Sequence, residues 1–453
     1  MSEIPTNKNS LLDERQARYR ALTAQLIGEL DKKVIEREEL VRLIVLAILS
    51  RSHIFLIGQP GVGKTYIIDI ALRAIKGSKY FEYLVMAHTK PEEIFGTIRV
   101  LEDGSTEYNI EDSVLDSHFV MLDEMFKGRS EILNSLLGVT SNERVFHMRG
   151  YGARRVPLIT LFGASNEFPS DDALDPFDDR LLLRYEVERI KDPENYKRFI
   201  RGDFDRSKEV NVELTIDDIY YIESAIDGVS IPDEIVEMYL KIKQNIIQER
   251  VRISDRKMIT AMNRILKTSA YLNGRNHVDY SDLFLLIHIA WRDYTERRKV
   301  KRIVFTTIFG SDKEVEGLLA DIERELVTYE GYLENEVGDF IYKREQVDSK
   351  SVEAYYNARM GEFDRLYRGF ASLRDHLNKV ETFYRFLKAV EKQLEENIFV
   401  LSFREKTFSQ ESRMKMYQLG KRVDHGVEIM ETFRQNCPDP YSYMHFNANA
   451  ILR

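Results

Sequence analysis

The stretch HIFLIGQPGVGKTYIIDIAL, His53–Leu72, decides the fold of this chain. It begins as a strand-length apolar run, turns through glycines and continues with apolar residues at helical spacing. Gly58 to Thr65 fits the pattern G-x-x-x-x-G-K-[ST], and it lies between the expected strand and the expected helix. Glycines at such a turn let backbone N–H groups aim at phosphate oxygens beside the positive end of a helix. The stretch therefore predicts a phosphate-binding loop, in preference to an ordinary glycine-rich turn with a surface lysine.

This loop predicts ATP and Mg²⁺ as ligands. Lys64 is expected to reach the β- and γ-phosphates, and the Thr65 hydroxyl to ligate the metal. The residues that we expect to contact nucleotide here are Gly58, Pro60, Gly61, Val62, Gly63, Lys64, Thr65 and Tyr66.

Two further apolar runs end in polar residues. HFVMLDE ends in Asp123 and Glu124, and LITLFGASNEFP ends its strand with Asn166. A carboxylate at a strand end can hold Mg²⁺, and an adjacent glutamate can polarise water, so Asp123 is assigned to the metal and Glu124 to general base catalysis. Asn166 is expected to orient the water or contact the γ-phosphate. A solvated turn, or a turn-forming Asn before Pro169, is the alternative.

Three arginines are candidates for contacts with phosphate. DPFDDRLLLRYEV offers Arg180 and Arg184, and either one could reach the γ-phosphate of a neighbouring subunit or form a surface salt bridge. ISDRKMI places Arg256 in the first turn of a helix behind the expected N-cap Ser254. From there we expect it to fold back onto the phosphates and sense hydrolysis.

Composition limits the class of protein. The chain has 453 residues, 43% hydrophobic and 31% charged, which predicts two or three domains with a charged surface. The net charge of -9 argues against nucleic-acid binding, and the basic run Trp291–Arg302 is interpreted as a solvated helix face or linker. With one cysteine, Cys437, no intrachain disulfide is possible. The first residues lack the basic-then-apolar pattern of a signal sequence, and the sequence has no apolar run of 18 residues, so a cytoplasmic protein without a membrane span is expected.

The periodicity predicts three regions. Five short apolar runs between about residues 53 and 187 predict an α/β core, a parallel sheet covered by helices, within residues 1–190. Residues 191–302 are expected to form an all-α lid, and residues 303–453 a helical extension. In that extension, two stretches with apolar residues at spacings of three and four, Val315–Phe340 and Leu366–Leu387, predict an antiparallel coiled-coil hairpin or a small bundle, with both alternatives left open.

The ordered series of these motifs resembles AAA+ ATPases, and more narrowly the MoxR family near its RavA branch. The matching stretches include FLIGQPGVGKT, TKPEEIFGTI, FVMLDEMFKGRSEILNSLL, LFGASNEFP, FDDRLLLRY and ISDRK, and they cover about residues 15–300. The resemblance implies that Asn166 is sensor 1, Arg180 the arginine finger and Arg256 sensor 2. It also implies that Val34 and Ile35 lie on the adenine side.

The resemblance carries further expectations. It implies an insertion with a turn at EDGS after the second strand, and a hairpin around Gly150 and Gly152. Members of the family typically form hexameric rings that remodel or activate other proteins, often with a von Willebrand factor A-type partner. The resemblance weakens beyond about residue 300.

Functions other than ATP-driven remodelling are supported to different degrees. GTP as the nucleotide is disfavoured because no [NT]-K-x-D stretch follows the P-loop region, whereas a nucleotide-gated switch stays open as an alternative. A nucleic-acid motor is disfavoured by the acidic balance. An ATPase component of a phage-defence or nucleic-acid-processing assembly stays open.

Overall fold

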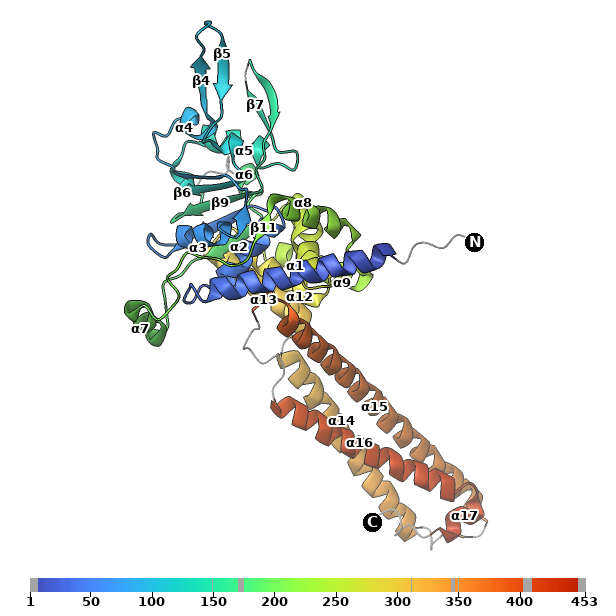
Figure 1. The fold of residues 1–453 in the computed structure, drawn as a ribbon. Helices are drawn as coiled ribbons and strands as arrows, with labels where there is room; N and C mark the ends of the chain where they lie inside the picture. The colour runs from blue at the N-terminus through green and yellow to red at the C-terminus, as the bar shows by residue number, and fades with distance from the viewer. Residues whose placement is uncertain are drawn as a thin grey trace, which may run out of the picture. The chain divides into compact units, whose positions relative to one another are not determined.

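The chain folds into two compact units (Figure 1). The computed structural model describes residues 7–148, 150–169, 175–310, 312–343, 347–348, 350–401 and 410–446. The first unit comprises residues 1–308 together with 392–402, and the second comprises residues 309–391 together with 403–453. The first unit holds both the predicted α/β region and the predicted lid.

The centre of the first unit is a five-stranded parallel sheet in the order β10-β1-β9-β6-β3. The strands are β1 (Ile54–Ile57), β3 (Tyr80–Leu84), β6 (Phe119–Asp123), β9 (Thr160–Ser165) and β10 (Leu183–Glu186). Every residue of β1 and β9 is buried, which is the pattern of parallel strands with both faces covered by helices. The five apolar runs read from the sequence form these five strands, so the predicted fold class is confirmed.

Helices surround the sheet and continue into the helical region beyond it. Those of the sheet region are α1 (Asn7–Asp31), α2 (Glu38–Leu49), α3 (Lys64–Leu72), α4 (Pro91–Phe95), α5 (Ser130–Val139) and α6 (Asp175–Asp178). Those that follow are α7 (Pro193–Arg201), α8 (Ile216–Ala225), α9 (Asp233–Gln248), α10 (Asp255–Thr260), α11 (Lys267–Leu272), α12 (Tyr280–Leu283) and α13 (Tyr294–Phe309). A short parallel pair, β2 (Ile75–Lys76) with β11 (Leu214–Thr215), connects the two regions. Helix α2 is apolar around nearly its whole circumference and buries nine of its 12 residues, so it lies in the core.

Two antiparallel hairpins rise from one end of the sheet region (Figure 1). They are β4 (Thr97–Val100) with β5 (Thr106–Asn109), and β7 (Val145–Met148) with β8 (Gly152–Arg155). The hairpins touch, because Tyr151 Oη donates to Thr106 Oγ1 at 2.7 Å and the rings of Tyr108 and Tyr151 lie 5.8 Å apart. The insertion and the hairpin expected from the resemblance are therefore both present.

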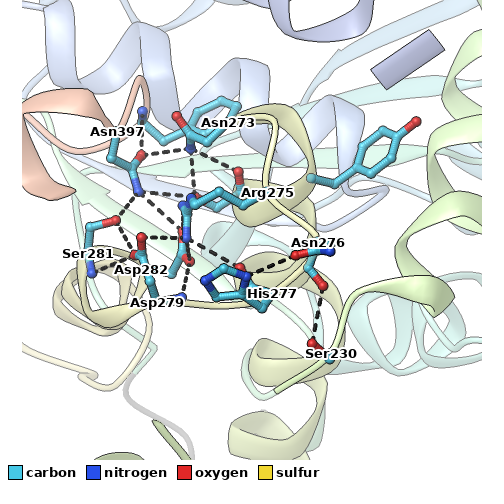
Figure 2. Close-up of polar contacts among 12 residues, drawn as sticks. Ser230, Asn273, Arg275, Asn276, His277, Asp279, Ser281, Asp282 and Asn397 are labelled. Atoms are coloured by element: carbon cyan, nitrogen blue, oxygen red, sulfur yellow. Dashed lines mark hydrogen bonds and ion pairs between the residues drawn. The ribbon is translucent and has the colours of Figure 1, made fainter. Parts of the chain in front are cut away.

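A buried polar network around Asn397 fixes residues 392–401 to the helical region of the first unit (Figure 2). Asn397 Nδ2 donates to Ser281 Oγ at 2.8 Å and to Asp282 Oδ1 at 3.2 Å. Asn397 Oδ1 accepts from Asn273 Nδ2 at 3.1 Å. Since a buried polar group without a partner is costly, these hydrogen bonds select one docked position for the segment.

The second unit is a small helical bundle, one of the two arrangements left open above. Its helices are α14 (Asp312–Lys343), α15 (Val352–Glu396), whose last residues belong to the first unit, α16 (Gln410–Asn436) and α17 (Pro440–His445). Buried side chains from three helices form its core, among them Leu319, Leu326, Phe370, Leu373, Val423 and Phe433. Helix α16, which the two predicted stretches did not include, supplies the third side of this core.

The described residues include no helix that is long and apolar enough to cross a membrane. The basic run pairs within the first unit: Arg292 with Asp175 at 2.7 Å, and Arg297 with Glu186. One face of the run therefore packs in the first unit through ion pairs and the buried Trp291, whereas the sequence predicts a solvated helix face or linker.

Candidate nucleotide-binding site

The loop after β1 needs its glycines for conformation and for space. Gly61 and Gly63 have φ values of +79° and +89°, in the left-handed region that favours glycine. Gly63 is the N-cap of α3, so the loop leads directly into the N-terminus of a nine-residue helix. A Cβ on Gly58 would collide with the carbonyl oxygen of Val187. The loop therefore has the backbone that an anion-binding turn requires.

Lys64 lies inside this loop in a negatively charged environment. Its Nζ donates to the Gly58 carbonyl oxygen at 2.7 Å, and the side chain is buried. Burial lowers the pKa of Lys64, while the carboxylates of Asp123 and Glu124 act in the opposite direction. Thr65 follows, half-buried, in the first turn of α3. The predicted phosphate and metal residues are thus close enough to interact.

The two strands that end in polar residues lie beside β1. Asp123 is the last residue of β6, and Asn166 directly follows β9, which lies between β6 and β1. Glu124 Oε2 and Asn166 Oδ1 are buried and accept no hydrogen bond within the described part of the chain. The contact nearest to Glu124 Oε2 among the ion pairs is Lys127 Nζ at 3.4 Å. These two oxygens, at the carboxyl ends of β6 and β9, are therefore available to accept hydrogen bonds from a bound ligand or water.

Glu124 also has an unusual backbone. Its φ is +52°, in the left-handed region, where a glutamate is uncommon. Such a conformation costs on the order of 1–3 kcal/mol and persists where the surrounding structure imposes it, often at functional sites. Asp123 Oδ1 accepts from the Glu124 N–H at 3.0 Å and holds this turn. No signal in the sequence predicts this conformation.

A cleft of about 530 Å³ adjoins the loop. Val34 and Ile35 line it together with residues 60–63 and Tyr66, so the segment predicted to lie beside adenine meets the phosphate loop here. Arg37, which sequence reasoning missed, ties the two together: its Nε donates to the Val62 carbonyl oxygen at 3.4 Å.

Lys33 and Glu36 were missed as well. Both contact the segment around α7 through side-chain hydrogen bonds. One feature of the sequence could have indicated Lys33, Glu36 and Arg37. They directly flank Val34 and Ile35 in the stretch KKVIER.

Arg180 and Arg184 have different environments. Arg184 is fully buried and forms an ion pair with Asp178, also buried, so it holds the fold together and is inaccessible from outside. Arg180 is half-buried, and its Nε donates to the Leu137 carbonyl oxygen at 3.1 Å. Burial, with a contribution from Arg256, lowers the pKa of Arg180. Of the two alternatives, Arg180 is the one that a neighbouring molecule could reach.

Arg256 is not brought to the phosphate loop of its own chain. It is exposed and lies with Arg180 and His53 around a small pocket where β1 begins, whereas the loop follows the end of β1. Ser254 is the N-cap of α10 as predicted, and its Oγ also donates to Asp179 Oδ1 at 2.7 Å. This hydrogen bond fixes the start of α10 beside the turn between α6 and β10 that carries Arg180. The fold-back of Arg256 onto its own phosphates, expected from the sequence, is absent from this structure.

The chain matches two family models. Residues 20–222 match the MoxR domain in the MoxR-vWA-beta-propeller ternary systems, and residues 234–304 match the AAA lid domain. An uncharacterized protein of Methanocaldococcus jannaschii is 34% identical over 280 residues, which are 61% of this chain and 72% of that protein. The chaperone MoxR1 of Mycobacterium tuberculosis is 26% identical over 136 residues, covering 30% of this chain and 34% of that one.

The fold is shared with solved structures. Among them is that of a protein described as a putative ATPase from Cytophaga hutchinsonii, which aligns with a TM-score of 0.55 and 17% identity. The alignment covers 67% of this chain and 98% of that protein.

Proposed function

Because the chain belongs to the MoxR family of AAA+ ATPases, we propose that it hydrolyses ATP between copies of itself in a ring and thereby remodels or activates a partner protein. We expect the ring to be a hexamer. The observation that carries this proposal is the convergence of Lys64, Asp123, Glu124 and Asn166 at the carboxyl ends of three adjacent strands.

The residues present fit Mg-ATP. The loop offers a helix N-terminus and a buried lysine, which suit a polyphosphate. Thr65 and Asp123 are oxygen donors of the kind that Mg²⁺ prefers. Glu124 Oε2 and Asn166 Oδ1 accept no hydrogen bond within the described residues and are suited to a water molecule between them and the γ-phosphate. When bound, Mg²⁺ would neutralise charge that develops on the phosphates.

Each protein group then has one task. Lys64 binds the β- and γ-phosphates, and Thr65 with Asp123 holds the metal. Glu124 Oε2 accepts a hydrogen bond from the attacking water and orients it, since this oxygen has no hydrogen bond to give up. Asn166 orients the same water or the γ-phosphate.

Arg180 and Arg256 are proposed to act on the nucleotide of the neighbouring subunit. They lie together at the edge where β1 begins, away from their own loop, and the same small pocket is lined by Arg51 and Arg264. Positive charge at this edge suits the phosphates of a nucleotide bound to the adjacent subunit. An arginine that stabilises the transition state of phosphoryl transfer raises the rate by roughly 10³- to 10⁵-fold. Arg256 therefore enters the proposal as a second arginine in trans, in place of the cis sensor that the sequence predicts.

The partner is proposed from the family. The family model that matches residues 20–222 describes MoxR domains from MoxR-vWA-beta-propeller ternary systems. We therefore propose a von Willebrand factor A-type protein as the partner. The narrower placement near the RavA branch stays a prediction.

The test is the ATPase rate per chain of the full-length protein over a series of concentrations, with molecular mass determined at each point. We expect the rate per chain to rise as the ring assembles. Glu124→Gln should bind ATP and lose hydrolysis, whereas Lys64→Ala should lose binding. A monomer with a concentration-independent rate would refute the interface mechanism, and a Glu124→Gln rate equal to the wild-type rate would refute the general-base assignment.

A further inference from the structure

Helix α7 presents aromatic residues that its own fold leaves uncovered. It buries none of its nine residues. Tyr196 and Phe199 are 54% and 48% exposed, and Ile200 is 67% exposed. Because a helix this short is not stable by propensity alone and normally packs through its apolar side, these rings need another partner.

The helix is nevertheless fixed in position at both ends. At the N-terminal end, the Glu36 carboxylate accepts from the backbone N–H groups of Lys191 and Asp192 at 2.7 and 2.9 Å. Beyond the C-terminal end, Lys33 Nζ donates to Ser207 Oγ at 2.9 Å and to the Ser207 carbonyl oxygen at 3.0 Å. Lys33 and Glu36 directly flank the two residues assigned to the adenine side. The same segment thus supports both the predicted base site and α7.

The exposed rings face the cleft beside the phosphate loop. Tyr196, Phe199 and Phe204 line it together with the loop and the adenine-side segment, whereas Ile200 on the same helix does not. The rings of Phe199 and Phe204 are stacked, with centroids 5.7 Å apart and planes within 7°. Arg206 lies over the Phe204 ring at 5.3 Å. One wall of the cleft is therefore a set of ordered π-faces.

We propose that Tyr196, Phe199 and Phe204 form an aromatic wall against which the purine base of the bound nucleotide stacks. This proposal rests on the proposed function, because it assigns the base-binding side of the same site. The cleft volume of about 530 Å³ lies in the range of sites that enclose small organic ligands. With the triphosphate at the phosphate loop on one side of the cleft, the planar base is the part of the nucleotide best suited to the aromatic side.

Stacking has a chemical signature that separates it from other contacts. Every base has a π-face, so the wall contributes to the affinity for any purine nucleotide and gives nothing to a ligand without a base. Loss of one stacked ring weakens binding of the base by about five- to 150-fold. The competing explanation is that α7 packs on a neighbouring subunit of the ring.

The test is to titrate the full-length protein with Mg-ATP and with Mg-tripolyphosphate by calorimetry. Phe199→Ala should weaken ATP binding by about five- to 150-fold and leave tripolyphosphate binding unchanged. Phe199→Tyr, which keeps the ring, should restore ATP binding. Ile200→Ala is the matched control on the same helix and should change neither affinity.

Other results would overturn the proposal. An unchanged ATP affinity in Phe199→Ala and in Tyr196→Ala would do so, as would equal losses for both ligands. A lowered oligomer mass with unchanged ATP affinity would assign α7 to the subunit interface instead. If the wild-type protein bound neither ligand, the proposed function itself would fail, whereas wild-type binding of ATP with unaffected alanine variants would refute the aromatic wall alone.

Discussion

Replacing Asn397 by leucine should destabilise the first unit strongly, although the two side chains are similar in size. Asn397 is 5% exposed, and its side chain takes part in five hydrogen bonds with well-defined partners (Figure 2). The leucine leaves two buried donors without their acceptor: the Phe399 N–H, now 3.0 Å from Asn397 Oδ1, and one Nδ2 hydrogen of Asn273. At about 1–3 kcal/mol for each orphaned group, the free energy of unfolding should fall by about 2–6 kcal/mol.

The assay is urea unfolding followed by the fluorescence of Trp291, the only tryptophan, which is buried in the first unit. This probe reports the unit that contains the network, even if the bundle unfolds in a separate step. Asn211→Leu, an exposed change in the same unit, is the control and should lie within about 0.5 kcal/mol of wild type. A loss of less than about 1 kcal/mol in Asn397→Leu would refute the view that this network holds the segment in place.

Two further changes test the junction between the sheet and the helical region. Arg184→Ala leaves the buried Asp178 with only its longer ion pair, to Arg292 at 3.9 Å, and should lower the free energy of unfolding by about 3–5 kcal/mol, measured by the same urea assay. A loss below that of Arg180→Ala would contradict a structural role. Lys257 is buried, and burial lowers its pKa to about 7, so between pH 7 and its ordinary pKa the unfolded chain binds more protons than the folded one. The free energy of unfolding should therefore rise from pH 7 to 9, by at most about 1.4 kcal/mol per pH unit from this group, and Lys257→Met should lack that share of the rise. Equal pH dependence in the variant and the wild type would contradict the assignment.

The sequence predicted the parts of the structure that depend on local pattern. The five apolar runs form the five strands of the sheet, and the stretch EDGS lies at the turn of the β4–β5 hairpin, where Gly104 has a φ of +80°. The phosphate loop was predictable because its backbone conformation requires glycine at certain positions, and these glycines are visible in the sequence.

Features that depend on tertiary position were not predictable. Arg180 and Arg184 stand four residues apart, on either side of one apolar run, yet Arg184 is fully buried and Arg180 is accessible. The position of Arg256 depends on how the helical region packs on the sheet, through contacts such as that of Ser254 with Asp179. The third helix of the bundle was missed because α16 has more polar residues between its apolar positions than the two predicted stretches.

The central claim is that each active site is completed by a neighbouring subunit. The direct test is the ATPase rate of an equal mixture of Arg180→Ala and Glu124→Gln proteins, each of which should be inactive alone. In a randomly mixed ring, about one quarter of the interfaces would pair an intact Glu124 with an intact Arg180 from the adjacent subunit. The proposal therefore predicts that about one quarter of the wild-type rate per chain returns on mixing. A mixture that forms rings and stays as inactive as its components would contradict it.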